Sequence, residues 1–197
     1  MSKRILGDPK RLSRGHVLAW HFVEDTGKLG FGDGRKVVVG KTLSIKRGEK
    51  PECCFCGLHG SVDIVDALRY ACGSLLCRVE LWGDLDTQDD KVAARNRRVI
   101  WMVDATDLLQ TFACWCAQRA LERERAAGRE PAKESWAAIE AKLAWLRGEI
   151  DTEELAAASA TARAAAWAAA SAAARAAQRA QLITMLNGLE WEEVDCD

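Results

Sequence analysis

Residues 57–107 read GLHGSVDIVDALRYACGSLLCRVELWGDLDTQDDKVAARNRRVIWMVDATD and hold the densest run of alternating helix and strand signals in the chain. Apolar residues at helical spacing follow Ser61, which can cap a helix, and Gly73 can end that helix. Residues 75–82 and 91–103 are rich in β-formers and predict two strands. This stretch therefore predicts a helix followed by two strands of one sheet.

The segments around this stretch predict further strands and the loops between them. Residues 17–23, VLAWHFV, are an apolar run rich in β-formers and predict a buried strand. Residues 37–45, VVVGKTLSI, predict another strand with a bend at Gly40. The glycine-rich residues 27–34 open no helix and predict a turn-rich loop, not a phosphate-binding loop. The acidic residues 83–90 predict a second loop.

Beyond residue 104 the sequence predicts helices. Asp104 and Asp107 resemble a capping pair for a helix that should end near Gly128. Residues 135–147 predict an amphipathic helix. In residues 155–181, 17 of 27 residues are alanine, so this segment should be helical with little help from packing.

Together these patterns predict an α+β fold. A small N-terminal β-rich domain with one or two inserted helices should precede an all-helical, alanine-rich C-terminal region. The expected parts are a basic arm at 1–16, the β-rich domain at 17–104, a connecting helix at 105–131 and the helical region at 132–197.

Composition narrows the classes of function. The net charge of -1 disfavours general polyanion binding, so a nucleic-acid partner is not expected despite the basic arm. No apolar run approaches the roughly 20 residues that span a bilayer, and no signal peptide follows the basic start, which predicts a cytoplasmic protein without membrane contact. In that compartment the eight cysteines should be reduced thiols.

A cysteine cluster at residues 52–59, ECCFCGLH, contains a two-residue spacing found in zinc sites. Cys53, Cys56, His59 and Cys72 are the candidate zinc ligands, but packed thiols are the favoured interpretation, so no metal and no cofactor are expected. The sequence also has no nucleophile elbow and no kinase signature, and it suggests no catalytic residue.

A second candidate site would exist if aromatic, histidine and polar residues of the β-rich domain line one cleft. His59 precedes the expected helix, where an imidazole and backbone amides can meet an anion. A loop carbonyl that satisfies the ring is the alternative. The candidate ligand-binding residues are Trp20, His21, His59, Ser61, Arg69 and Tyr70.

Several words of the chain resemble an uncharacterised family of phage and bacterial proteins. They are GLHGS at 57–61, DALRYA at 66–71, LLCRVEL at 75–81, DDKVAA at 89–94 and VIWMVDATDLL at 99–109. Members of that family resemble this chain in an AWHF-like first strand and an alanine- and arginine-rich helical tail. The resemblance implies a phage or mobile-element origin and carries no assigned chemistry.

The order of elements is also similar to the middle of the ADP-ribosyltransferase fold. In that fold an early-strand histidine and an aromatic residue or serine hold nicotinamide dinucleotide, and a later glutamate activates the acceptor. The resemblance puts His21 in the first role and His59 or Ser61 in the second. Residues 99–103 offer no glutamate, and Glu80 lies on a different strand. The resemblance therefore implies a pocket that binds a nucleotide without transferring it, while an active transferase would need Glu80.

The resulting expectation is a non-enzymatic, phage-encoded accessory protein that acts by binding a host protein or complex. Inhibition of a host defence system, as by an anti-CRISPR protein, is one form of this function. The alternative is a degenerate or active ADP-ribosyltransferase-like protein that binds a nucleotide. The alanine-rich helix should carry the protein contacts and permit a homo-oligomer, through Trp167, Arg163, Arg175 and Arg179.

Overall fold

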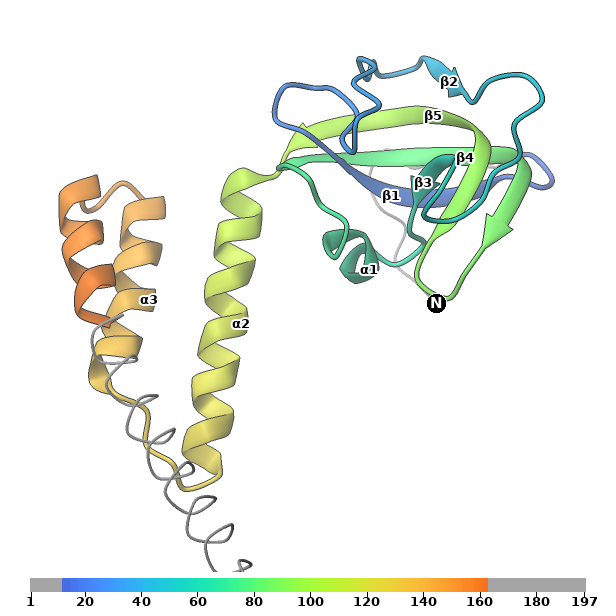
Figure 1. The fold of residues 1–197 in the computed structure, drawn as a ribbon. Helices are drawn as coiled ribbons and strands as arrows, with labels where there is room; N and C mark the ends of the chain where they lie inside the picture. The colour runs from blue at the N-terminus through green and yellow to red at the C-terminus, as the bar shows by residue number, and fades with distance from the viewer. Residues whose placement is uncertain (1–11, 163–197) are drawn as a thin grey trace, which may run out of the picture. The chain divides into compact units, whose positions relative to one another are not determined.

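The computed structural model describes residues 12–162 of the chain. The chain forms two compact units, Met1–Leu109 and Gln110–Asp197. An antiparallel sheet in the first unit is followed by helices (Figure 1), which confirms the predicted α+β class. In the described residues, no helix is both long enough and apolar enough to cross a membrane.

A long hairpin dominates the sheet. Strands β4 (Leu75–Thr87) and β5 (Val92–Asp104) pair along their whole length, and the turn closes where the Gln88 N–H donates to the Lys91 carbonyl at 2.9 Å. Both strands were predicted, but the loop predicted at 83–90 is shorter than expected and covers only residues 88–90 of that range. Residues 83–87 continue β4, because Leu85, Asp86 and Thr87 pair with the start of β5.

The hairpin curves because its register shifts twice, once after Arg78 and once between Trp82 and Leu85. Such bulges bend a strand and increase its twist. Strand β1 (Val17–Val23), predicted with these bounds, pairs antiparallel with β4. The short strands β2 (Thr42–Ser44) and β3 (Leu58–Gly60) share the opposite edge of β5.

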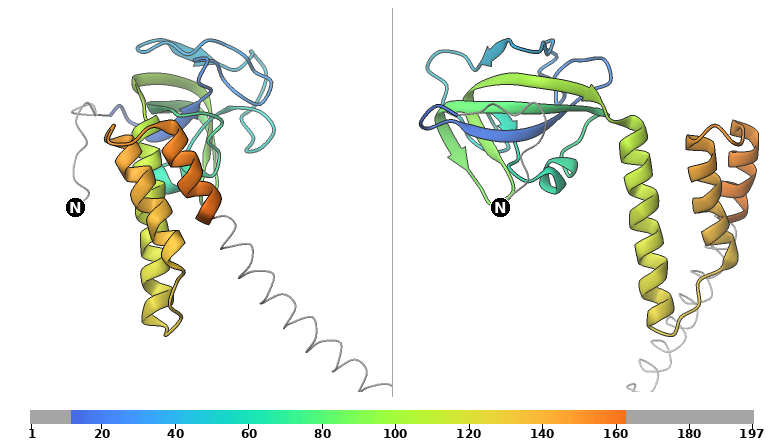
Figure 2. Two further views of the ribbon diagram at one scale, coloured as in Figure 1. Left: turned by 90° about the vertical axis from the view of Figure 1, so that its left-hand side faces the viewer. Right: turned by 180° about the vertical axis from the view of Figure 1, so that it is seen from behind.

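A backbone bridge connects the two ends of this curved sheet. Trp20 and Ser61 exchange two hydrogen bonds, of 2.7 and 2.9 Å, so the chain after β3 returns to β1. Figure 2 shows the strands wrapping around a common interior. Its apolar core includes Ala19, Val23, Leu58, Cys77, Val79, Leu81 and Val99. Polar side chains of the same unit line a cavity, which is the candidate site.

The strand predicted at 37–45 is shorter than expected. Only Thr42–Ser44 is strand, while Val39 makes an isolated bridge to Val99. The bend predicted at Gly40 is confirmed, since its φ of 80° lies in the left-handed region that glycine adopts without strain. That reversal ends the pairing and leaves Val39 exposed.

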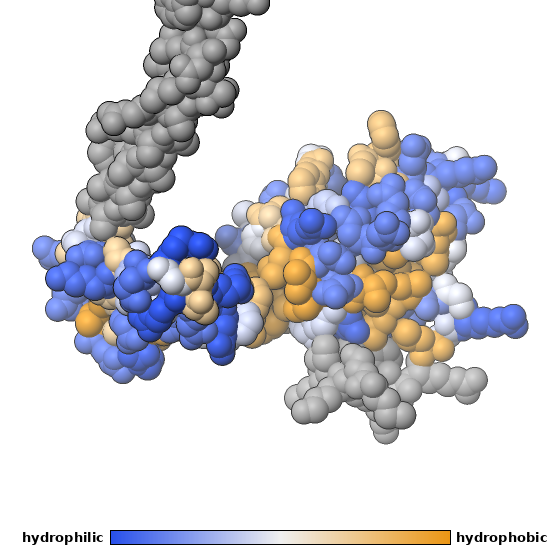
Figure 3. Space-filling model, turned by 90° about the horizontal axis from the view of Figure 1, so that it is seen from below, coloured by the Kyte–Doolittle hydropathy of each residue, from blue (hydrophilic) through white to orange (hydrophobic). Residues whose placement is uncertain are grey.

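Helix α1 (Ile64–Leu68) differs from its prediction at both ends. Asp63 caps it, because the backbone of Ser61 is engaged in the bridge to β1. The helix ends at Leu68, so Gly73 does not terminate it. Gly73 lies against β1 instead, where a Cβ atom would come within 2.6 Å of the Val23 carbonyl oxygen. Figure 3 shows the unit that contains the sheet from below, with apolar side chains on its surface.

The helices of the C-terminal region follow the predictions closely. Helix α2 (Thr106–Ala126) begins after the Asp104 carboxylate accepts the Thr106 N–H, and α3 (Lys133–Leu146) matches the predicted amphipathic segment. Another helix covers residues 152–162. Most of the alanine-rich segment lies outside the described residues, as do the basic residues 1–11 and the contact residues Trp167, Arg163, Arg175 and Arg179.

Candidate functional site

A cavity of about 910 Å3 lies in the sheet unit. Its walls include five of the six predicted ligand-binding residues, namely Trp20, His21, His59, Ser61 and Tyr70. Arg69 is not brought to this cavity. Its side chain is 67% exposed and pairs weakly with Asp66 and Asp90 at 3.9 Å.

The central polar group of the cavity is Arg97, which the sequence analysis missed. Arg97 lies on β5, is 2% exposed, and donates from Nη1 to the His59 carbonyl at 2.7 Å. Its Nε and Nη2 atoms are buried without a hydrogen-bond partner among residues 12–162. Burial lowers the pKa of this guanidinium to about 10, so it stays charged near neutral pH.

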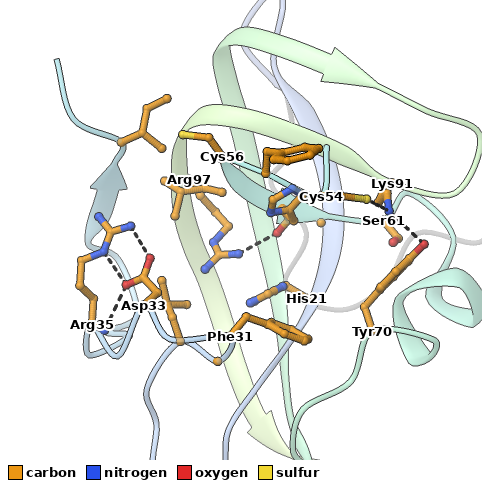
Figure 4. A pocket seen from close by; sticks show the side chains of 18 of the residues that line it. His21, Phe31, Asp33, Arg35, Cys54, Cys56, Ser61, Tyr70, Lys91 and Arg97 are labelled. Carbon is orange, nitrogen blue, oxygen red and sulfur yellow. Dashed lines mark hydrogen bonds and ion pairs between the residues drawn. The ribbon is translucent and has the colours of Figure 1, made fainter. Parts of the chain in front are cut away.

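Two histidines accompany this guanidinium. The pKa of His21 lies well below its ordinary value, first because burial disfavours the imidazolium and then because Arg97 and His59 are near. Burial and Arg97 also lower the pKa of His59. In each ring Nε2 is buried and has no partner in the described part of the chain. Figure 4 shows Arg97 and His21 directed into the same space.

Two exposed aromatic residues line the same cavity. Phe31 is 86% exposed and Phe55 is 84% exposed, although neighbouring aromatic side chains such as Phe22 are buried. Phe31 has a φ of 57°, an unusual backbone conformation for a bulky residue. These rings therefore offer flat apolar surface at the wall of a pocket whose interior is cationic.

An ion pair stabilises the loop that carries Phe31. Arg35 donates to the two carboxylate oxygens of Asp33 from Nε and Nη2, each at 2.7 Å, and also to the Ser44 carbonyl. The hydrogen bonds from Arg35 lower the pKa of Asp33. Bidentate pairing restricts both side chains, so the glycine-rich loop is anchored to β2.

A chain of hydrogen bonds forms another part of the wall. Lys91 Nζ lies 2.9 Å from Cys54 Sγ and 3.3 Å from the Tyr70 hydroxyl, which donates to Asp90 at 2.5 Å. The ammonium group also lies over the Tyr70 ring. Hydrogen bonds to Cys54 and Tyr70 raise the pKa of Lys91, so it remains protonated.

The candidate zinc ligands are not brought together. Cys53 Sγ donates to the Asp86 carbonyl, Cys56 Sγ faces Glu49, and Cys72 Sγ donates to the Phe22 carbonyl. Within residues 12–162 no group of three or more histidine, cysteine and acidic side chains has an arrangement that could hold a metal ion.

Glu80, the carboxylate that an active transferase would need, is buried and bound to two other side chains. It is 5% exposed, and its oxygens bind His16 Nδ1 at 2.7 Å and Arg98 Nη2 at 2.5 Å. His16 also stacks on Trp82. Glu80 is not among the residues that line the cavity. The site is thus equipped to hold a negatively charged group, with no contribution from this carboxylate.

Comparison of the sequence with known proteins gives a similarity to a family of unknown function. Neither a curated protein nor a solved structure gives a significant match to the chain. Residues 20–111, which comprise nearly all of the sheet and the first turn of α2, are similar to a family described as a domain of unknown function (DUF7666).

Proposed function

We propose that the sheet domain is a binding module for an anionic small molecule that carries a planar ring, with a nucleotide as the fitting class. The observation that carries this proposal is Arg97, a buried guanidinium with two nitrogen atoms, Nε and Nη2, unpaired among the described residues. An unpaired buried polar group costs about 1–3 kcal/mol, and more when it is charged. A bound phosphate or carboxylate would accept hydrogen bonds from those nitrogen atoms and compensate the buried charge.

His21 and His59 also favour binding of an anion. Their unpartnered Nε2 atoms lie in the cavity with Arg97, as far as residues 12–162 are concerned. Each neutral ring can donate one hydrogen bond, and an anion would also favour the protonated form. Buried donors that converge on one cavity are a suitable environment for an oxyanion.

The exposed rings of Phe31 and Phe55 support a ligand with a planar part. Aromatic side chains stack on bases because every base has a π-face. The cavity of about 910 Å3 is within the size range of small-molecule sites, which is about 300–1,000 Å3. A nucleotide would be bound here without transfer, because the Glu80 carboxylate binds His16 and Arg98 instead.

Calorimetric titration with ADP, pyrophosphate and adenosine tests this function. We expect ADP to bind, pyrophosphate to bind more weakly and adenosine most weakly, because Arg97 and the rings act on different parts of the ligand. Replacement of Phe31 by alanine should weaken ADP binding by roughly 5- to 150-fold and leave pyrophosphate unchanged. Phe112→Ala, on α2, is the matched control. Absence of binding by both ADP and pyrophosphate contradicts the proposal.

We also propose a protein-binding function, for which helix α2 gives the supporting observation. Leu108, Phe112 and Trp115 follow an i, i+4, i+7 pattern and are 62%, 40% and 50% exposed, and the two rings stack. Exposed apolar residues on one helical face are typical of partner-binding helices. This function corresponds to an accessory protein that binds a host protein, as a defence inhibitor does.

The helix variant Leu108→Gln/Phe112→Gln/Trp115→Gln tests that function. Affinity capture with the wild-type chain should return a stoichiometric partner, which the variant should lose while keeping its helical circular dichroism. Light scattering on the purified chain distinguishes a second copy from a different protein. A monomeric wild-type chain that captures nothing more than the variant does would exclude this function.

A further inference from the structure

We infer that Cys54 is a reactive thiol that is oxidised by peroxide, and that its modification controls access to the cavity it lines. The second part of this inference rests on the proposed ligand-binding function. The first part rests on the surroundings of the thiol alone.

The Cys54 sulfur is accessible and has a cation beside it. It lies 2.9 Å from the ammonium group of Lys91. A positive charge at that distance stabilises negative charge on sulfur, and the thiolate is the nucleophilic form. Tyr70 positions Lys91 from the other side, through its hydroxyl and its ring, and Asp90 accepts the Tyr70 hydroxyl hydrogen. Figure 4 shows Cys54, Lys91 and Tyr70 connected in this order.

Neighbouring cysteines have the opposite surroundings. Burial raises the pKa of Cys53, and burial together with Glu49 raises the pKa of Cys56. Cys77 is in the core, where burial raises its pKa to about 12. Cys116 is exposed on α2, at some distance in sequence, and serves as an internal reference. The contrast within CCFC predicts that modification is selective for one of three adjacent thiols.

An independent observation indicates that this thiol borders a ligand site. Cys54 and Lys91 line the cavity into which the buried Arg97 directs N–H groups that have no partner within the described ranges. The backbone of Cys54 has a φ of 74°, a left-handed conformation that is uncommon for residues other than glycine. The turn therefore holds the sulfur toward the cavity wall and Lys91 at some conformational cost.

The chemical step balances with hydrogen peroxide as the oxidant. The Cys54 thiolate attacks one peroxide oxygen, a sulfur–oxygen bond forms, and the oxygen–oxygen bond breaks. Sulfur loses two electrons and the peroxide gains them. The departing hydroxide takes a proton from solvent and becomes water, leaving a sulfenic acid. Lys91 then faces a neutral group in place of a thiolate, which alters charge at the cavity wall.

Peptide mass spectrometry of the full chain tests the reactivity directly. The protein is treated with limiting peroxide and a sulfenic-acid trap, and in a parallel sample with iodoacetamide. We expect Cys54 to react about tenfold faster than Cys116 near pH 7, since an unassisted thiol is only a few per cent thiolate there. Lys91→Met should reduce this ratio to about one, and Tyr70→Phe should reduce it partly. Lys41→Met, which removes an exposed cation that does not line the cavity, should leave it unchanged.

The outcomes separate this inference from the ligand-binding proposal. Equal rates at Cys54 and Cys116 in the wild-type chain, or an unchanged ratio in Lys91→Met, overturn the reactive thiol whether or not a ligand binds. Saturating ADP should slow Cys54 and not Cys116. If calorimetry shows ADP binding but the Cys54 rate stays the same, control of the cavity is overturned. If neither ADP nor pyrophosphate binds, the ligand proposal fails, while the rate ratio of Cys54 to Cys116 still tests the reactive thiol.

Discussion

Replacement of Arg97 by methionine is expected to weaken binding of ADP and pyrophosphate strongly while the free protein remains at least as stable as the wild type. Arg97 is 2% exposed and leaves Nε and Nη2 unpaired in the part of the chain that is described. Its charge therefore lowers the stability of the free fold. Methionine fills a similar volume, has no charge to desolvate, and adapts to irregular packing.

The expected magnitudes have opposite directions for binding and for folding. Loss of a buried, charge-assisted contact to a phosphate should cost about 2–5 kcal/mol of binding free energy, or roughly 30-fold or more in affinity. The free energy of unfolding should change by about 0 to +3 kcal/mol, because relief of the buried charge exceeds the loss of one hydrogen bond to the His59 carbonyl. Calorimetry and urea unfolding measure the two quantities.

Arg98 provides the matched control on the same strand. Its side chain does not line the cavity and binds Glu80, which is 5% exposed. Arg98→Met should keep ADP affinity and lower the free energy of unfolding by about 1–3 kcal/mol, because a buried carboxylate loses a partner. Arg97→Met with intact affinity, or with stability reduced by more than Arg98→Met, would falsify a ligand-binding role for Arg97.

Sequence periodicity predicts β1 and β5 closely, but it predicts β4 and β2 with different bounds and misses β3 and the closure of the sheet. The bounds of β1 coincide with an apolar run of seven residues, and the second half of β5 contains the apolar residues 99–103. The link from Trp20 to Ser61, however, is made by backbone atoms. Backbone bridges leave no pattern in side chains, so Ser61 reads as a helix cap although its backbone is already paired.

Some residues of the candidate site could be predicted from the sequence and others could not. His21, His59 and Tyr70 could be selected from the sequence because histidine and tyrosine often bind ligands. The fold brings all three to one cavity. Arg97 belongs to the run RNRR, which reads as a solvated strand face. The available signal is its two-residue spacing from the apolar Val99, which places both on the interior side once β5 is recognised. Phe31 lies in a glycine-rich loop, and hydrophobic periodicity does not predict the conformation of such a loop.

The free energy of unfolding of the free protein is expected to fall as the pH is lowered from about 7 to about 5. The pKa of His21 is held well below 6.5 in the folded chain by burial and by the nearby Arg97, while an unfolded histidine titrates normally. Below its ordinary pKa the unfolded state therefore takes up a proton that the folded state refuses, and unfolding becomes easier. The stabilisation is complete above that pKa and is lost as the pH falls.

One such histidine gives a slope of about 1.4 kcal/mol per pH unit, and the less buried His59 adds a smaller amount. Carboxylates with lowered pKa values, such as Asp33 and Asp104, lose their contributions only below their unfolded pKa of 3.8, so the histidine window is separate. Urea unfolding at several pH values, repeated with His21→Gln, measures the slope. A flat profile, or a slope that His21→Gln leaves unchanged, is incompatible with a neutral His21 beside Arg97.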